Sequence, residues 1–132
     1  MKDSKTSAIM IVTLPEIEQY RAELADDPIA LRSLEMLEDC EGDLEDAAIA
    51  LALQVGQEPD QSERWLEGLA KRWRVSLCET EIQTALSQGS IAAAVRSLST
   101  DTMLPSLLAV PVVLFAVKSG IDPFCRPLQE KL

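Results

Sequence analysis

The chain of 132 residues contains no histidine, the side chain that most often acts as a general base or metal ligand near neutral pH. It also lacks the motifs GxxxxGK, GxGxxG and GxSxG, which bind phosphate groups or present a nucleophilic serine. Cys78 lies near a predicted helix start, but no histidine is present to activate its thiol. We therefore predict no catalytic residues, no cofactor and no enzymatic activity.

Cysteine is sparse as well: Cys40, Cys78 and Cys125 are far apart, odd in number and without a C-x-x-C pair. This pattern is typical of a reducing compartment, where thiols stay free. The N-terminal apolar run "SAIMIV" is too short for the core of a signal peptide and has no small-residue cleavage pattern. We expect a cytoplasmic protein.

Aromatic residues make up only 4% of the chain, so the core must consist mainly of Leu, Ala, Ile and Val. An Ala- and Leu-rich composition favours helices over sheets, and no alternating strand pattern competes with the helical spacing. A length of 132 residues is typical of one domain. The sequence predicts an all-α fold, a single compact domain over residues 1–132, made of about seven short helices around a kinked apolar C-terminal helix.

Capping residues mark several helix starts. Thr13 and Glu16 form a capping-box pattern, and Leu14 opens the apolar stripe of the helix that follows. Asp27 and Pro28 are typical of an N-cap and a first helical residue. In the second half, similar patterns predict caps at three more places, namely Asp60 with Glu63, Ser76 with Glu79, and Ser90.

The stretch "DCEGDLED", residues 39–46, holds five carboxylates around Gly42. An EF-hand calcium loop beginning at Asp39 would need glycine at its sixth position and glutamate at its twelfth, where this chain has Leu44 and Ala50. A left-handed Gly42 that ends one helix, and Asp43 as the N-cap of the next, explain the stretch without a metal ion. We predict a helix-to-helix turn and no metal site.

The segment "LEDCEGDLEDAAIALAL" resembles the junction between the second and third helices of ubiquitin-associated domains, where a Gly-Asp pair precedes a helix. The resemblance extends over residues 29–56. The chain has no Met-Gly-Phe-type loop, with which those domains contact ubiquitin. The resemblance therefore implies a capped pair of helices and does not imply ubiquitin binding.

Charge divides the chain into two unequal parts. Residues 1–60 carry 15 acidic and 4 basic side chains, a net charge of −11, whereas residues 61–132 carry 7 acidic and 8 basic ones and are nearly neutral. The acidic half repels nucleic acid and favours a partner protein with a basic surface, although a solvated surface would show the same excess. The candidate docking residues, which we call the acidic face, are Glu38, Asp39, Glu41, Asp43, Glu45 and Asp46.

Tryptophan and arginine gather in "RWLEGLAKRWR", residues 64–74. Indole and guanidinium groups can stack on and clamp an anionic or planar ligand. The alternative is that the indoles belong to the core or its rim, while the cations lie in solvent near the negative end of a helix. The residues of this candidate Trp/Arg patch for an anionic ligand or a partner are Arg64, Trp65, Arg72, Trp73 and Arg74.

Residues 103–117 carry no charged side chain. This run is shorter than the ~20 residues that a helix needs to span a bilayer. We therefore expect no membrane span but a buried hub helix at residues 103–118, kinked at Pro111 and surrounded by the other helices.

These features favour a non-enzymatic protein–protein interaction or regulatory module that uses its acidic N-terminal half. The alternative is a carrier or sensor of a small apolar ligand, with a pocket beside the hub helix. Such a pocket would be lined by Leu107, Val112 and Phe115, with Arg72 or Arg74 at its mouth. The sequence does not indicate the oligomeric state.

Overall fold

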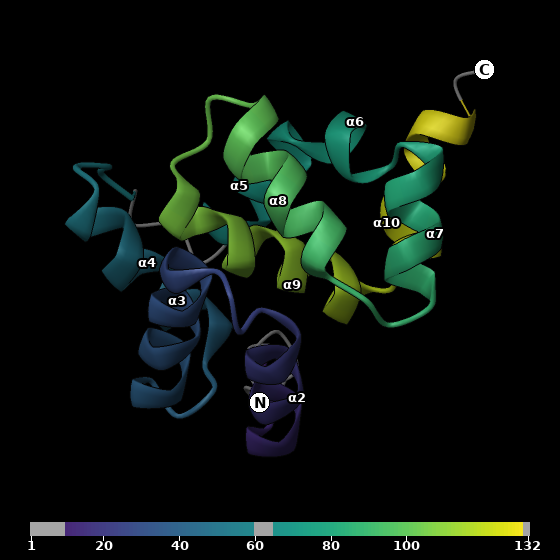
Figure 1. The fold of residues 1–132 in the computed structure, drawn as a ribbon. Coiled ribbons are helices and arrows are strands. Elements are labelled where there is room, and N and C mark those ends of the chain that lie inside the picture. The colour runs from purple at the N-terminus through teal and green to yellow at the C-terminus, as the bar shows by residue number, and fades with distance from the viewer. Residues whose placement is uncertain (1–9, 60–64, 131–132) are drawn as a thin grey trace, which may run out of the picture.

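The computed structural model describes residues 10–59 and 65–130, and it confirms the all-α fold (Figure 1). Figure 1 shows α2, α3 and α4 at one end of the molecule, α6, α7 and α10 at the other, and α5, α8 and α9 between them. The described residues form α2 (Leu14–Glu23), α3 (Pro28–Asp39), α4 (Leu44–Gln54), α5 (Trp65–Arg72), α6 (Arg74–Leu77), α7 (Thr80–Ser87), α8 (Ala92–Asp101), the 3-10 helix η1 (Ser106–Leu108), α9 (Ala109–Ser119) and α10 (Ile121–Glu130).

The helix starts predicted in the first half are confirmed. The Thr13 hydroxyl accepts a hydrogen bond from the Glu16 backbone amide at 3.3 Å, and the Glu16 carboxylate accepts one from the Thr13 amide at 2.8 Å. Asp27 caps α3 and Asp43 caps α4, each by accepting a hydrogen bond at 3.1 Å from a backbone amide three residues on. These local bonds satisfy amides that a helix start otherwise leaves without a partner.

Gly42 lies in the turn between α3 and α4 with a φ of 84°, as its predicted left-handed conformation requires. The extended segment before α2 crosses this turn: the Val12 amide donates to the Gly42 carbonyl at 2.9 Å, and the Leu44 amide donates to the Met10 carbonyl at 3.0 Å. A Cβ atom on Gly42 would lie 2.3 Å from the Val12 carbonyl oxygen. The glycine is therefore needed both for its φ and for the close approach of the N-terminal segment.

The caps predicted in the second half are wrong where they can be compared. Ser76 lies inside α6, and Glu79 precedes α7 without a capping hydrogen bond from its side chain. The start of α8 is capped from α2, because Glu23 Oε2 accepts hydrogen bonds from Ser90 Oγ at 2.6 Å and from the amides of residues 91 and 92 at 2.8 Å. The pattern of Asp60 and Glu63 lies outside the described residues.

Helix α9 is the centre of the packing, as predicted for the hub helix, and contacts α3, α4, α5, α8 and α10. Its boundaries differ from the prediction of 103–118. Met103 is 91% exposed, and regular helix begins only after η1. Pro111 is the third residue of α9, where its missing N–H removes no helical hydrogen bond. The predicted kink in the apolar C-terminal region is present, but it lies at Gly120, where the chain bends by 96° between α9 and α10, and not at Pro111.

In the part of the chain that the structure describes, no single helix is long and apolar enough to cross a membrane. The bent pair formed by residues 106–119 and 121–128 passes that test by length and composition alone.

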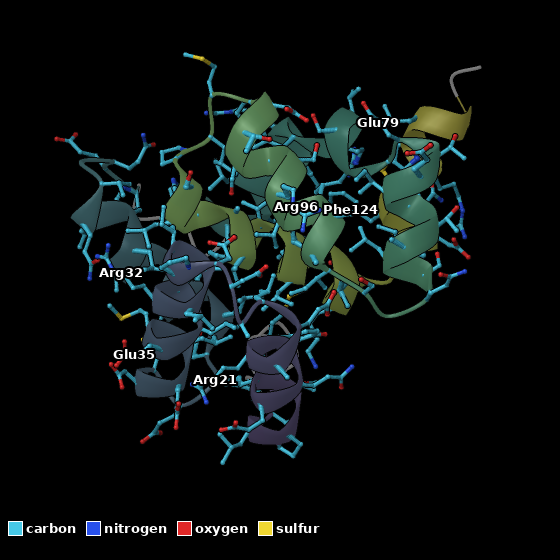
Figure 2. The ribbon with its side chains drawn as sticks, viewed as in Figure 1. Arg21, Arg32, Glu35, Glu79, Arg96 and Phe124 are labelled. Atoms are coloured by element: carbon cyan, nitrogen blue, oxygen red, sulfur yellow. A yellow bond between two sulfur atoms is a disulfide. The ribbon has the colours of Figure 1, made fainter. Side chains whose placement is uncertain are left out.

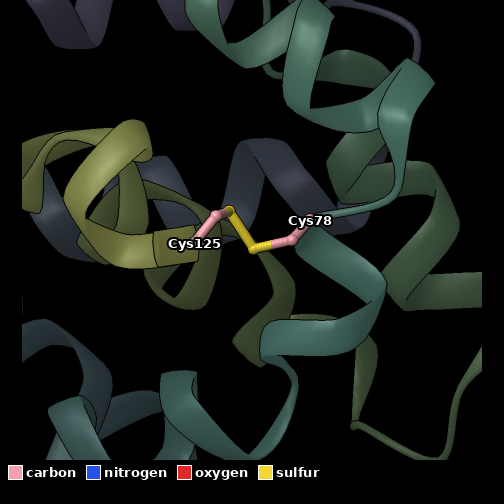
Figure 3. Close-up of a disulfide and its surroundings, with 2 residues drawn as sticks. All are labelled: Cys78 and Cys125. Carbon is pink, nitrogen blue, oxygen red and sulfur yellow. A yellow bond between two sulfur atoms is a disulfide. The ribbon is translucent and has the colours of Figure 1, made fainter. Parts of the chain in front are cut away.

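Cys78 and Cys125 form a disulfide, whereas the cysteine spacing predicted free thiols (Figure 3). Their Cα atoms lie 5.7 Å apart although 47 positions separate them in the sequence. The bond links the end of α6 to the first turns of α10, and Cys40 is left as a free thiol. The cytoplasmic location stays a prediction, and the cysteine pattern no longer supports it.

Candidate functional site

The candidate site lies at the end of the molecule that α2, α3 and the α3–α4 turn build, where Figure 2 labels Arg21 and Glu35. Three residues of the predicted acidic face are engaged within the protein. Glu38 pairs with Arg21 at 2.6 Å, Asp43 caps α4, and Glu45 accepts a hydrogen bond from the Leu66 amide at 3.2 Å. Their carboxylates stabilise the fold and are only partly available to a partner.

The other three residues of the acidic face, Asp39, Glu41 and Asp46, are exposed. Within residues 10–59 and 65–130, their side chains have no hydrogen-bond or ion-pair partner. Asp39 ends α3, Glu41 lies in the turn with a φ of 58°, and Asp46 is in the first turn of α4. The turn thus holds three solvated negative charges close together in the sequence, and no basic side chain of the described chain neutralises them.

The carboxylates of the turn affect the pKa of the half-buried thiol of Cys40. Burial raises the pKa of this thiol, and the negative charges of Asp46, Asp43 and Asp39 raise it further. Each carboxylate disfavours the thiolate because like charges repel. Cys40 is therefore held as a neutral thiol, which is an unreactive form, beside a concentrated negative potential.

Two exposed apolar side chains lie at the same end. Ile11, 46% exposed, pairs through its backbone with Asp43 as an isolated bridge, and its Cγ2 atom would lie 3.3 Å from a Cβ atom on Gly42. Leu14, 55% exposed, is the first residue of α2, although the sequence placed it on the buried stripe. The spacing of apolar residues does not predict that Ile11 and Leu14 are exposed. Their exposure depends on the fold, which brings the N-terminal segment across the α3–α4 turn.

A metal ion has no evident site in the described residues, where no group of three or more acidic or cysteine side chains is placed to hold one. Three carboxylates of the acidic face bond to other groups instead: Glu38 pairs with Arg21, and Asp43 and Glu45 accept hydrogen bonds from backbone amides. The absence of a metal site stays a prediction for titration with calcium, magnesium and zinc.

The predicted Trp/Arg patch divides among different surroundings. Arg64 lies outside the described residues; Trp65 and Trp73 are half-buried against the core; Arg72 is exposed. The Arg74 guanidinium lies over the Phe124 ring of α10, 4.9 Å from its centroid. The Nε1 atom of Trp73 and the Nε atom of Arg74 are buried without a hydrogen-bond partner in the described structure. Arg72 and Arg74 thus have different surroundings, and the patch stays a prediction.

Residues proposed for a ligand pocket beside the hub helix are mostly part of the core. Leu107 is 7% exposed and Val112 is 0% exposed, while Phe115 packs edge-on against Phe124 with the ring centroids 6.5 Å apart. A hollow of about 290 Å³ lies elsewhere, on the surface of α7. It is lined by polar side chains, which are Thr80, Gln83, Thr84, Ser87 and Gln88.

Comparison of the chain with protein-family models, with curated proteins and with solved structures found no match. The comparisons therefore carry no functional information, and the ubiquitin-associated resemblance reduces to what the structure bears out, a capped pair of antiparallel helices, α3 and α4.

Proposed function

We propose that this protein is a non-enzymatic interaction module that binds a basic partner protein at its acidic end. The observation that carries the proposal is the exposed group of Asp39, Glu41 and Asp46, which has no ion-pair partner among residues 10–59 and 65–130, at the same end as the exposed apolar side chains of Ile11 and Leu14. Apolar contacts give an interface most of its affinity, and charges around them give register, partner choice and association rate.

The charge distribution supports a basic partner over a neutral one. Residues 1–60 have a net charge of −11, and the described part of this half supplies only Arg21 and Arg32 as counter-charges. Arg21 is already paired with Glu18 at 2.8 Å and with Glu38 at 2.6 Å. A partner rich in Lys and Arg would complement this field, whereas nucleic acid would be repelled.

The test removes charge at this end and compares it with an equal loss elsewhere. The face variant combines three substitutions in the α3–α4 turn, Asp39→Asn, Glu41→Gln and Asp46→Asn. The control variant neutralises three exposed acidic residues of the second half, by Glu79→Gln, Glu81→Gln and Asp122→Asn. An amphipathic peptide of leucine and lysine serves as the probe. We expect the face variant to weaken binding by at least about tenfold, and the control by less than about threefold, because local charges outweigh net charge at contact distance.

A Leu14→Gln variant tests the apolar part of the site, since its side chain is exposed and its loss should leave the fold intact. Binding to the probe should weaken and become more sensitive to salt, because charge then supplies a larger share of the affinity. Equal binding by the face variant and the control would show that the acids serve only solubility, and the proposed docking role would be rejected.

A further inference from the structure

Helix α10 lies at the opposite end of the molecule from the acidic face, where it packs against α6, α7 and α9 (Figure 1). Of its residues 121–128, only Phe124 and Cys125 are buried, at 5% and 0% exposure. Phe124 packs against Phe115 of α9 and lies under the guanidinium of Arg74 in α6. These ring contacts, and packing against α6, α7 and α9, hold α10 by non-covalent means.

The connection from α9 to α10 is a single residue. Gly120 has a φ of 90° and separates two helices that are bent by 96° relative to each other. Because only this one position joins the two helices, a change in its dihedral angles would swing α10 away from α6 and α7 without disturbing α9. The chain therefore has a joint at the base of α10.

The disulfide is the covalent tie that opposes such a movement (Figure 3). It joins Cys125, the most buried of residues 121–128, to Cys78 at the end of α6. Cys78 is half-buried as a residue, whereas Cys125 is fully buried, so we expect a reductant to attack at Cys78. We infer that the Cys78–Cys125 disulfide is a redox latch, whose reduction by a dithiol lets α10 swing out about Gly120 and uncovers the apolar surface around Phe115.

The chemistry balances without any further group. A thiolate of the dithiol attacks Cys78 Sγ, the sulfur–sulfur bond breaks, and Cys125 leaves as a thiolate that takes up a proton. The second thiol of the reductant then attacks the mixed disulfide and releases Cys78 as a thiol. The dithiol loses two electrons and two protons and becomes a disulfide, and both cysteines become thiols. Because this latch lies away from the acidic face, the inference does not rest on the proposed function.

Amide hydrogen exchange of the full chain, with and without dithiothreitol, tests the latch. In the reduced protein, the amides of residues 121–128 should exchange at least about tenfold faster, while those of α3 and α4 keep their rates, because opening is local. Mass spectrometry confirms the gain of two hydrogens in the native state. The Cys40→Ser variant is the matched control, since Cys40 is not part of the latch, and it should behave as the wild type does.

The double variant Cys78→Ser, Cys125→Ser reproduces the open state without a reductant, and its α10 amides should exchange as fast as those of the reduced wild type. Unchanged exchange in α10 after reduction would overturn the inference. An equal rise in α3, α4 and α10 would overturn it as well, because the disulfide would then stabilise the whole fold and not one helix. Resistance of the native disulfide to dithiothreitol would do the same.

Discussion

Helix α2 buries only Ile17 and Tyr20 and is also held by charged side chains, whereas helix α9 is held by apolar side chains alone among its buried residues. From α2, Glu16 pairs with Lys118 at 2.8 Å, and Glu23 caps α8. Helix α9 buries seven of its residues, from Ala109 to Ala116, among five neighbouring helices. The attachment of α2 should therefore respond to pH and salt, and the packing of α9 to changes in side-chain volume.

Truncating a central side chain of α9 should have the largest effect on stability. Leu114 is 1% exposed, so Leu114→Ala should lower the free energy of unfolding by about 2–5 kcal/mol through lost burial and a residual cavity. Leu53 of α4 is 62% exposed, and Leu53→Ala should change it by less than about 0.5 kcal/mol. Chemical denaturation of both variants measures the difference, and similar losses would contradict the central place of α9.

The α3–α4 turn should show the next largest effect, through Gly42. Gly42→Ala should destabilise the protein by about 2–3 kcal/mol, because φ is 84° and the added Cβ would meet the Val12 carbonyl. Gly56 has a φ of 80° but open space around it, so Gly56→Ala measures the conformational part alone, about 1 kcal/mol. Thermal or urea unfolding compares the two, and equal costs would mean that the N-terminal segment does not cross Gly42 closely.

The hydrogen bonds between α2 and α8 can be weakened by a substitution that keeps the size and shape of the side chain. Glu23→Gln keeps an acceptor oxygen but removes the negative charge of the carboxylate, which accepts three hydrogen bonds. We therefore expect the free energy of unfolding to fall by about 1–2 kcal/mol. Glu35→Gln is the control, since Glu35 is exposed. Urea denaturation measures both variants. A loss no larger than that of the control would show that the α8 start is hydrated and not capped from α2.

The smallest effect concerns pH. Burial alone would raise the pKa of Glu16, but hydrogen bonds from Lys118 and Thr13 and the Lys118 charge hold it below its usual 4.5. A carboxyl with a lowered pKa in the folded state stabilises the protein above pH 4.5 and loses that contribution as pH falls through the folded pKa.

Lys118→Met should therefore cost about 0.5 kcal/mol at neutral pH, a value kept small because solvent screens this partly exposed pair. The difference from the wild type should vanish in acid and shrink in high salt. Unfolding curves across that pH range provide the measurement. A difference that stays constant with pH would assign the effect to packing of the Lys118 side chain.

The fold class and the first helix starts were predictable because their signals are local. Thr13, Asp27 and Asp43 each bond to an amide three residues away, so a short window of sequence contains both partners. The start of α8 was mispredicted at Ser90 because its cap, Glu23, comes from 67 residues earlier. The sequence predicts a bend at Pro111, but regular helix begins only at Ala109, which places Pro111 in the first turn, where it breaks no helical hydrogen bond.

For the candidate site, the acidic stretch could be identified from the sequence. Which of its carboxylates bond within the protein and which stay in solvent could not. Glu38 and Glu45 find partners 17 and 21 residues away, which no local pattern shows. The exposure of Leu14 was hidden because its spacing fits the apolar stripe of α2. The pairing of Cys78 with Cys125 was equally out of reach, since spacing alone does not specify which cysteines meet.

The cap that Glu23 supplies to α8 also limits how the chain can be divided. Residues 10–59 contain the carboxylates of Glu23 and Glu45. The backbone amides that donate hydrogen bonds to them belong to residues 66, 91 and 92, in the other half of the chain. A fragment of either half would have charged groups or helix starts without their partners. The acidic half should therefore not fold independently when it is fused to another protein. Two separately expressed halves should become ordered only when they are mixed.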